Sequence, residues 1–229
     1  MRNKYTEFDI LIKERKNVIQ YVIEHYPEIV KHTESAKCYE MYSEQVDDLG
    51  LLTPSLIRDK INSGYHKGRK LKQKPTKENY TIYEFDNEMK PLRICQYNQY
   101  GCTLVFYFIS YENALFAIPS SKREIYSFYP TDIHKIEYRE SKIWKYSTIY
   151  SCALWQEVYS YKEDDYIECM NYYYVSKLAK SKKSVPLGQI GSPMQAWLAK
   201  IHISKNRIFK LSYYSISCKG EELIYDYRR

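Results

Sequence analysis

The sequence is poor in glycine and proline, with seven and eight among 229 residues. So few glycines leave no Gly-rich loop of the kind that cradles a phosphate, and they predict few turns that depend on glycine. No run of 18 apolar residues is present, which argues against a membrane-spanning helix. The start, MRNKYTEFDI, lacks the apolar stretch of a secretory signal, so we expect a cytoplasmic protein.

Residue patterns typical of metal sites and of catalytic nucleophiles are also missing. The six cysteines, at positions 38, 95, 102, 152, 169 and 218, form no Cys-x-x-Cys pair, and we expect reduced thiols. The histidines show no spacing typical of zinc ligands, since His25 and His32 are seven residues apart across Pro27. No G-x-S-x-G elbow occurs. The sequence therefore predicts no metal, no cofactor and no enzymatic activity.

Scattered side chains leave an enzyme open as an alternative. Carboxylate pairs occur at Asp164-Asp165 and Glu221-Glu222, where we predict turns and where acidic residues are ordinary. An assembled site would need several carboxylates, or carboxylates and histidines, around one centre. Its candidate residues would be His66, His134, His202, Asp164 and Asp165.

Tyrosine and positive charge are in excess. The chain has 27 tyrosines and a net charge of +7. The tyrosines have two explanations: an AT-rich genome, or a face that binds a partner, because tyrosine gives a large contact area at low entropy cost. The charge suits a nucleic acid, a membrane surface or an acidic protein as partner.

The first third of the chain has helical patterns. Residues 5–26 carry apolar side chains at helical spacing, and Pro27 either ends this helix or opens a second one. Residues 28–48 have a looser stripe and are also predicted to be helical. SLIRDKIN, after Thr53-Pro54, is predicted as a short third helix. Residues 64–79 contain six basic residues before Glu78 and are predicted to be a linker.

From about Tyr80 to Tyr227 the pattern has period two, which is typical of strands with two unlike faces. Residues 133–175 are predicted to form four antiparallel strands joined by polar turns. Residues 119–132 are predicted to be irregular and 176–193 flexible, whereas 194–200 fit a helical turn or a strand. The further predicted strands are Ile82–Phe85, Leu92–Tyr97, Thr103–Tyr111, Ala114–Ile118, Ile201–Ile203, Ile208–Tyr213 and Leu223–Tyr227.

Together these patterns predict an α+β fold in which N-terminal helices pack on a large, mainly antiparallel β-meander sheet. Residues 1–79 would form a helical region with a basic linker, and residues 80–229 a Tyr-rich antiparallel β domain, unless the two form one continuous domain.

Two groups of residues are predicted to bind a partner. The first is the basic linker, which would hold phosphate or an acidic partner unless it is only a solvated loop. It contributes Lys67, Arg69, Lys70 and Lys72. The second group alternates onto one strand face, either as core or as an exposed aromatic stripe for a partner or for unpaired bases. It contributes Trp144, Tyr146, Trp155, Tyr159 and Tyr161.

Helices followed by a long Tyr-rich meander with charged turns resemble the cytosolic immunity proteins of bacterial polymorphic toxin systems. The likeness rests on IHKIEYRESKIWKYS, VYSYKEDDYIECMNYYYV and LIYDY. It extends to the YD-type hairpin units of Rhs-like proteins, although the glycine usual in those turns is absent. The resemblance implies a non-enzymatic inhibitor that binds one cognate toxin and blocks its active site. A nucleic-acid-binding protein that uses basic loops and exposed aromatics is the alternative.

Overall fold

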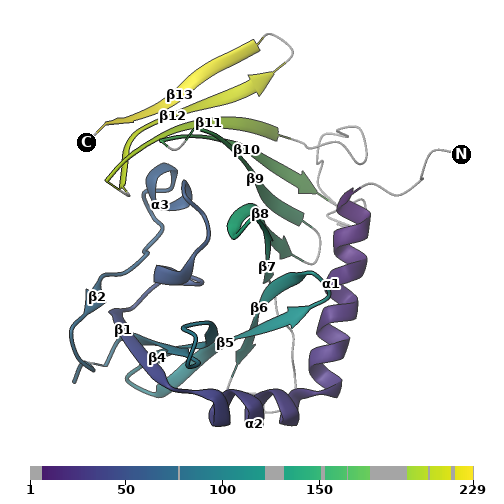
Figure 1. Cartoon of the computed structure of the whole chain (residues 1–229), viewed down its shortest axis with the longest axis vertical. Helices are drawn as coiled ribbons and strands as arrows, with labels where there is room; N and C mark the ends of the chain where they lie inside the picture. Colours follow the sequence, from purple (N-terminus) through teal and green to yellow (C-terminus); the bar gives the residue numbers. More distant parts are fainter. Residues whose placement is uncertain are drawn as a thin grey trace, which may run out of the picture. The chain divides into compact units, whose positions relative to one another are not determined.

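The computed structural model describes residues 7–76, 78–121, 132–150, 153–163, 165–175, 195–205, 207–217 and 220–228 (Figure 1). Its helices are α1 (Glu7–Glu24), α2 (Tyr26–Ala36) and α3 (Arg58–Ile61), with a 3-10 turn η1 (Gly50–Leu52). Its strands are β1 (Tyr39–Glu44), β2 (Lys70–Leu71), β3 (Tyr80–Phe85), β4 (Pro91–Asn98), β5 (Gly101–Tyr111), β6 (Ala114–Ser121), β7 (Asp132–Arg139), β8 (Lys142–Tyr150), β9 (Ala153–Glu163), β10 (Tyr166–Val175), β11 (Gln195–Ser204), β12 (Arg207–Ser217) and β13 (Gly220–Arg228). None of the helices in these ranges has the length and apolar character needed to cross a bilayer.

The strands form a 13-stranded sheet in the order β13-β12-β11-β10-β9-β8-β7-β6-β5-β4-β3-β1-β2. From β4 onward each strand lies beside the strand that precedes it in the chain, so this part of the sheet is a meander of hairpins. The predicted large antiparallel meander is confirmed. The predicted flexible stretch 176–193 and most of the predicted irregular connection 119–132 lie outside the described residues.

Contacts divide the chain into two compact units. Unit 1 comprises Met1–Glu14, Ser55–Ser63 and Lys135–Arg229, and therefore holds α3 and strands β8–β13. Unit 2 comprises Arg15–Pro54 and Gly64–His134, and holds α2 and strands β1–β6. Helix α1 and strand β7 are divided between the two units.

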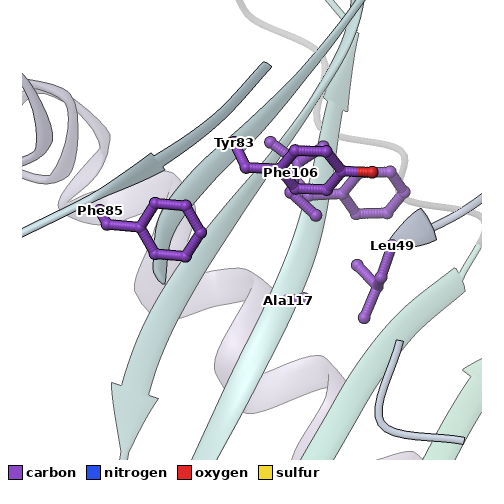
Figure 2. Packing of buried hydrophobic residues seen from close by; sticks show 6 residues of the cluster. Leu49, Tyr83, Phe85, Phe106 and Ala117 are labelled. Carbon is purple, nitrogen blue, oxygen red and sulfur yellow. The ribbon is translucent and has the colours of Figure 1, made fainter. Parts of the chain in front are cut away.

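The core of unit 2 gathers around Tyr83 of β3 (Figure 2). The apolar sequence of β5 predicts a strand with both faces covered, and Phe106 and Tyr107, which point to opposite faces, are both buried. Helix α2 packs on the same strand: the ring of Tyr26 contacts the ring of Tyr107 edge-on, with 5.9 Å between the ring centroids. The buried members of the cluster are Leu49, Tyr83, Phe85, Ile94, Phe106 and Ala117.

The Tyr83 hydroxyl also holds the turn at η1. The Tyr83 hydroxyl accepts a hydrogen bond from the backbone N–H of Leu51 at 3.1 Å and lies 3.2 Å from Ser43 Oγ. Gly50 makes this approach possible: it has φ +53°, and a Cβ built on it would lie 2.4 Å from the Tyr83 hydroxyl. A side chain at this position would clash, so the turn at η1 requires glycine.

The helix predicted over 28–48 is wrong beyond Ala36. Pro27 opens α2, but β1 follows and pairs with β3 from Tyr39 opposite Phe85 to Glu44 opposite Tyr80. The local apolar stripe is weak in this stretch, and a long-range strand pairing overrides it. The linker predicted over 64–79 contains the two-residue strand β2, which pairs with Tyr42 and Ser43. Residues 195–200 belong to strand β11.

The strand register of unit 1 gathers aromatic and polar side chains on one face. Opposite residues of adjacent antiparallel strands share a face. Tyr146 of β8 is opposite Glu157 of β9, which is opposite Asn171 of β10, which is opposite Trp197 of β11. The segment that begins at Ser55 and leads into α3 packs on this face, as the hydrogen bond from Ser55 Oγ to Glu157 Oε1 at 2.8 Å shows.

Several turns place residues other than glycine in the left-handed region. The β7–β8 turn consists of Glu140 at φ +48° and Ser141 at φ +63°, and two positive values are the mark of a type I′ hairpin turn. Left-handed backbone also occurs at Asp48, Met89, Glu112 and Lys205. A chain with few glycines can therefore still form turns with positive φ. The residues other than glycine at these positions carry steric strain.

We expect Ser141→Gly to raise the free energy of unfolding by about 0.5–1 kcal/mol, because glycine adopts positive φ without the Cβ clash. Ser160→Gly is the matched control, since Ser160 lies exposed within β9 and glycine weakens a strand interior. Urea unfolding followed by tryptophan fluorescence measures both variants. A loss of stability in Ser141→Gly would show that the turn is not strained.

Candidate functional site

Three cationic side chains of unit 1 lie over two aromatic rings beside the β7–β8 turn. The guanidinium carbon of Arg139 is 3.7 Å from the centroid of the Trp144 ring, and Lys145 Nζ is 4.5 Å from the same ring. Lys142 Nζ lies 5.0 Å from the centroid of the Tyr161 ring. We call these five residues the basic–aromatic cluster.

The hairpin register accounts for this arrangement. Tyr146 and Glu157 are opposite each other on β8 and β9, so Trp144 and Tyr161, each an even number of residues away, share their face. The two-residue turn brings Arg139 and Lys142 next to each other at the strand ends. The Tyr161 hydroxyl donates a hydrogen bond to the Ile143 carbonyl at 2.9 Å, which fixes its ring beneath Lys142.

Arg139 and Lys142 give the cluster exposed positive charge. Among the described residues, neither Arg139 nor Lys142 forms an ion pair, whereas Lys135 nearby in the sequence pairs with Glu14 at 2.8 Å. A guanidinium that stacks on an indole face keeps its N–H edge available for a planar, bidentate acceptor. The cluster is therefore suited chemically to carboxylate or phosphate groups.

Next to this cluster, the same face holds a fully buried carboxylate. Glu157 has 0% exposure, and its Oε1 accepts hydrogen bonds from Ser55 Oγ at 2.8 Å and from Trp155 Nε1 at 3.2 Å. Its Oε2 accepts a short hydrogen bond from the Tyr159 hydroxyl. That hydroxyl in turn accepts from the backbone N–H of Leu56 at 3.0 Å. The network fastens residues 55 and 56 to β9.

Burial dominates the electrostatics of this network. It raises the pKa of Glu157 against the opposing effect of the hydrogen bonds from Tyr159, Ser55 and Trp155. Burial, together with the charge of Glu157, holds the pKa of Tyr159 well above its ordinary value, and burial does the same for the pKa of the Cys169 thiol. The Tyr159 hydroxyl and the Cys169 thiol therefore stay protonated at neutral pH, and the hydroxyl serves as a donor to the carboxylate.

An aromatic row, half-buried except for the buried Tyr213, continues from the network toward β12. The ring centroids of Trp155 and Trp197 are 5.6 Å apart, and Trp197 stacks near Tyr213 at 6.3 Å. The Tyr213 hydroxyl accepts a hydrogen bond from Asn171 Nδ2 at 3.2 Å. Tyr173 adds a further ring at 6.4 Å from Trp155. The row is thus held by ring contacts and by hydrogen bonds.

The predicted aromatic group divides between core and half-buried positions. Tyr146 is fully buried and Tyr159 is 4% exposed, so both occupy the core position that the alternation allowed. Trp144, Trp155 and Tyr161 are half-buried. The prediction that all five share one face is supported by the register of β8 and β9.

The predicted basic linker residues belong to unit 2, whereas the aromatic group belongs to unit 1. Arg69 forms an ion pair with Glu44 at 2.8 Å, while Lys70 and Lys72 are exposed and Lys67 is half-buried. Beside them is a pocket of about 550 Å³. It is lined by Glu44, Gln45, Val46, Asp47, His66 and Asn79.

The candidates for an assembled catalytic centre are divided between the two units, and Asp165 and His202 are neighbours: Asp165 precedes Tyr166, which is opposite His202, and its backbone carbonyl accepts a hydrogen bond from the Ile203 N–H at 2.8 Å. His66 lines the pocket of unit 2, and His134 is buried against the Phe106 ring at 5.8 Å in the same unit. His202 belongs to unit 1 and lies beside Tyr166 at 4.9 Å. Asp164 lies outside the described residues. Within the described part of the chain, no group of three or more His, Cys, Asp or Glu side chains is placed to hold a metal ion.

Sequence reasoning missed two residues of the basic–aromatic cluster and one residue of the buried network beside it. Arg139 is predicted in a polar turn and Lys142 at the start of the next strand, and neither is predicted to bind a partner, although their position next to aromatic strand residues is a signal that cations will stack there. Glu157 lies between Trp155 and Tyr159 on the aromatic face, and an acid on such a face indicates a buried network. Its partner Ser55 is 102 residues away and leaves no signal in the sequence.

Comparisons with known proteins give no relative: no protein-family model, no curated protein and no solved structure matches the chain.

Proposed function

We propose that the chain is a non-enzymatic protein-binding module, an immunity-type inhibitor that binds a cognate bacterial toxin and blocks its active site. The observation that carries the proposal is the basic–aromatic cluster, in which Arg139 and Lys145 lie over Trp144 and Lys142 lies over Tyr161. The inhibitor role rests on the sequence resemblance, and the surface chemistry supports the binding.

The cluster has the composition of an interface hot spot. Tryptophan, tyrosine and arginine are the residues that contribute most to binding energy in protein–protein interfaces. Stacking restricts the long cationic side chains before a partner arrives, which reduces the entropy lost on binding. A rigid strand pair beneath the cluster, with the ring of Tyr161 fixed by its bond to Ile143, has the same effect.

The charge of the cluster indicates the kind of partner. The net charge of +7, together with Arg139 and Lys142, which form no ion pair with the residues that the structure describes, favours an acidic toxin surface over a basic one. Complementary charge accelerates association and selects against wrong partners, and salt weakens the effect. We therefore expect carboxylates of the toxin to meet the edge of the Arg139 guanidinium.

The test is protection of cells from the toxin encoded next to the gene of this chain. Co-expression of the full chain should restore growth. The triple variant Arg139→Ala, Lys142→Ala and Lys145→Ala should bind the purified toxin about 10- to 100-fold more weakly, because it removes the cationic half of the cluster. Isothermal titration calorimetry measures the dissociation constant.

A matched control removes the same charge elsewhere. Lys13, Lys31 and Lys90 are exposed, and their alanine variant has the same net charge as the cluster variant. It should bind the toxin almost as tightly as the wild type. Equal weakening in both triple variants would show that only net charge matters, and failure of the full chain to protect cells would rule out the inhibitor role.

Cations over aromatic rings also favour phosphate groups and stacked bases, so a nucleic-acid-binding protein is the second candidate. It predicts an affinity for single-stranded RNA or DNA that falls steeply between low and physiological salt. Fluorescence anisotropy with a labelled oligonucleotide measures this slope. Absence of binding at low salt would eliminate the candidate.

A further inference from the structure

Strand β13 presents an open edge. Among the described residues it is hydrogen-bonded along one side only, to β12, and it ends the strand order (Figure 1). An edge strand of nine residues offers a row of backbone N–H and C=O groups to any other strand, and soluble proteins usually block such an edge. The opposite end of the order, β2, has only two residues.

The middle of β13 carries apolar side chains and no charged side chain that would keep another strand from pairing with this edge. Leu223, Ile224 and Tyr225 are 53%, 55% and 39% exposed. Consecutive apolar residues that are this exposed on an edge strand mark a surface that another strand covers. Charged residues flank this apolar part: Glu221 and Glu222 near the start of the strand, and Asp226 and Arg228 near its end.

The register with β12 shows which residues of β13 lie at equal distances on the two sides of Tyr225. Tyr225 pairs with Tyr213 and Leu223 with Tyr214, so Ile224 is the extra residue of a β-bulge. When Ile224 is left out, Glu221 is the third paired residue before Tyr225 and Arg228 is the third after it. These two charged residues are therefore equally distant from Tyr225 along the ladder.

An antiparallel copy of β13, centred on Tyr225, would therefore have its Arg228 opposite Glu221 at both ends. Both side chains lie on the same face, because their partners on β12, Ile216 and Lys210, are an even number of residues apart. The Glu221 side chain is 45% exposed and that of Arg228 is 73% exposed. Glu221 already accepts from Lys200 and Arg228 donates to Asp226, but both groups keep free bonding capacity.

We propose that a second copy of this chain pairs its own β13 antiparallel to this edge, forming a twofold dimer with a continuous sheet. Glu221 near the start and Arg228 at the end of the strand favour the antiparallel arrangement, since an in-register parallel copy would place Glu221 beside Glu221 and Arg228 beside Arg228. An interface made of one strand is at the small end of the size range. We therefore expect a dissociation constant on the order of micromolar.

Charge reversal tests the pairing directly. In Glu221→Arg, the introduced guanidinium faces Arg228 of the second copy, and in Arg228→Glu two carboxylates face each other. Each variant alone should associate at least about tenfold more weakly than the wild type. An equimolar mixture of the two variants should associate again, because each arginine then faces a glutamate. Sedimentation velocity on the full chain, from about 5 µM to about 500 µM, measures the association.

Two exposed residues away from β13 supply matched controls. Lys13→Glu and Glu78→Arg make the same charge changes and should leave self-association within about twofold of the wild type, alone or mixed. A monomeric mass at every concentration would overturn the proposal. It would also be overturned if the two β13 variants associate like the wild type, or if their mixture associates no better than either variant alone.

Discussion

Replacing Glu157 by alanine is expected to lower the free energy of unfolding by about 3–5 kcal/mol. The substitution leaves three buried donors without their acceptor, on Ser55, Trp155 and Tyr159. It also opens a cavity in a fully buried position. Urea unfolding followed by tryptophan fluorescence measures the loss, because all three tryptophans belong to unit 1.

Glu157→Gln is the matched control for this prediction. The amide oxygen can still accept from Ser55 and Trp155, but the amide nitrogen meets the Tyr159 hydroxyl, which donates to the carboxylate in the native protein. We expect a smaller loss of about 1–2 kcal/mol. Equal losses in the two variants would show that the hydrogen bonds contribute nothing beyond the volume of the side chain.

The same carboxyl group predicts how stability depends on pH. Burial raises the pKa of Glu157, so the folded state holds this proton more tightly than the unfolded chain does. The stabilisation is complete below the unfolded pKa of about 4.5 and is lost as the pH rises through the folded pKa. Glutamine does not titrate, so the stability advantage of the wild type over Glu157→Gln should shrink across this range. An advantage that stays constant with pH would contradict the raised pKa.

In unit 2, Tyr83→Ala is expected to lower the free energy of unfolding by about 3–5 kcal/mol. The ring fills the centre of the cluster that includes Leu49 and Phe106 (Figure 2). Its hydroxyl also holds the backbone of Leu51, so the alanine variant loses both packing and a buried hydrogen bond. Urea unfolding followed by far-ultraviolet circular dichroism measures the change.

Tyr83→Phe separates the two contributions. It keeps the ring and removes only the hydroxyl, which leaves the Leu51 N–H without its acceptor. We expect a loss of about 1–3 kcal/mol, clearly smaller than that of the alanine variant. A phenylalanine variant as stable as the wild type would show that the hydroxyl does not hold the η1 turn.

The strands were predictable because their two faces differ. In β8, Trp144, Tyr146 and Tyr150 place aromatic rings on one face, whereas Ile143, Lys145 and Ser147 lie on the other. Period-two patterning of this kind specifies a strand without knowledge of its neighbours. β5 was predictable for a different reason, since its continuous apolar run fits only a strand covered on both sides.

β1 could not be predicted from its local pattern. Tyr39–Glu44 carries helix-compatible residues, and its conformation is decided by pairing with β3, a strand that comes later in the chain. The left-handed turns were hidden in the same way. Glutamate and serine at positions 140 and 141 do not predict positive φ, because the hairpin around them imposes this conformation.

The candidate site was predictable in part. The alternation placed Trp144 and Tyr161 on one face, and the register of β8 and β9 supports this placement. It could not show that Arg139 stacks on Trp144, because side-chain direction at a turn depends on the turn geometry. The link between Ser55 and Glu157 joins residues too far apart for any local rule.

The meander order has a consequence for synthesis on the ribosome. From β4 onward each strand finds its partner in the strand made just before it, so hairpins can add one at a time as the chain emerges. Some contacts are long-range instead, and Ser55 must wait for Glu157, translated 102 residues later. Closure of the α3 segment over β9 is therefore a late event, after the nascent sheet has already grown well past its midpoint.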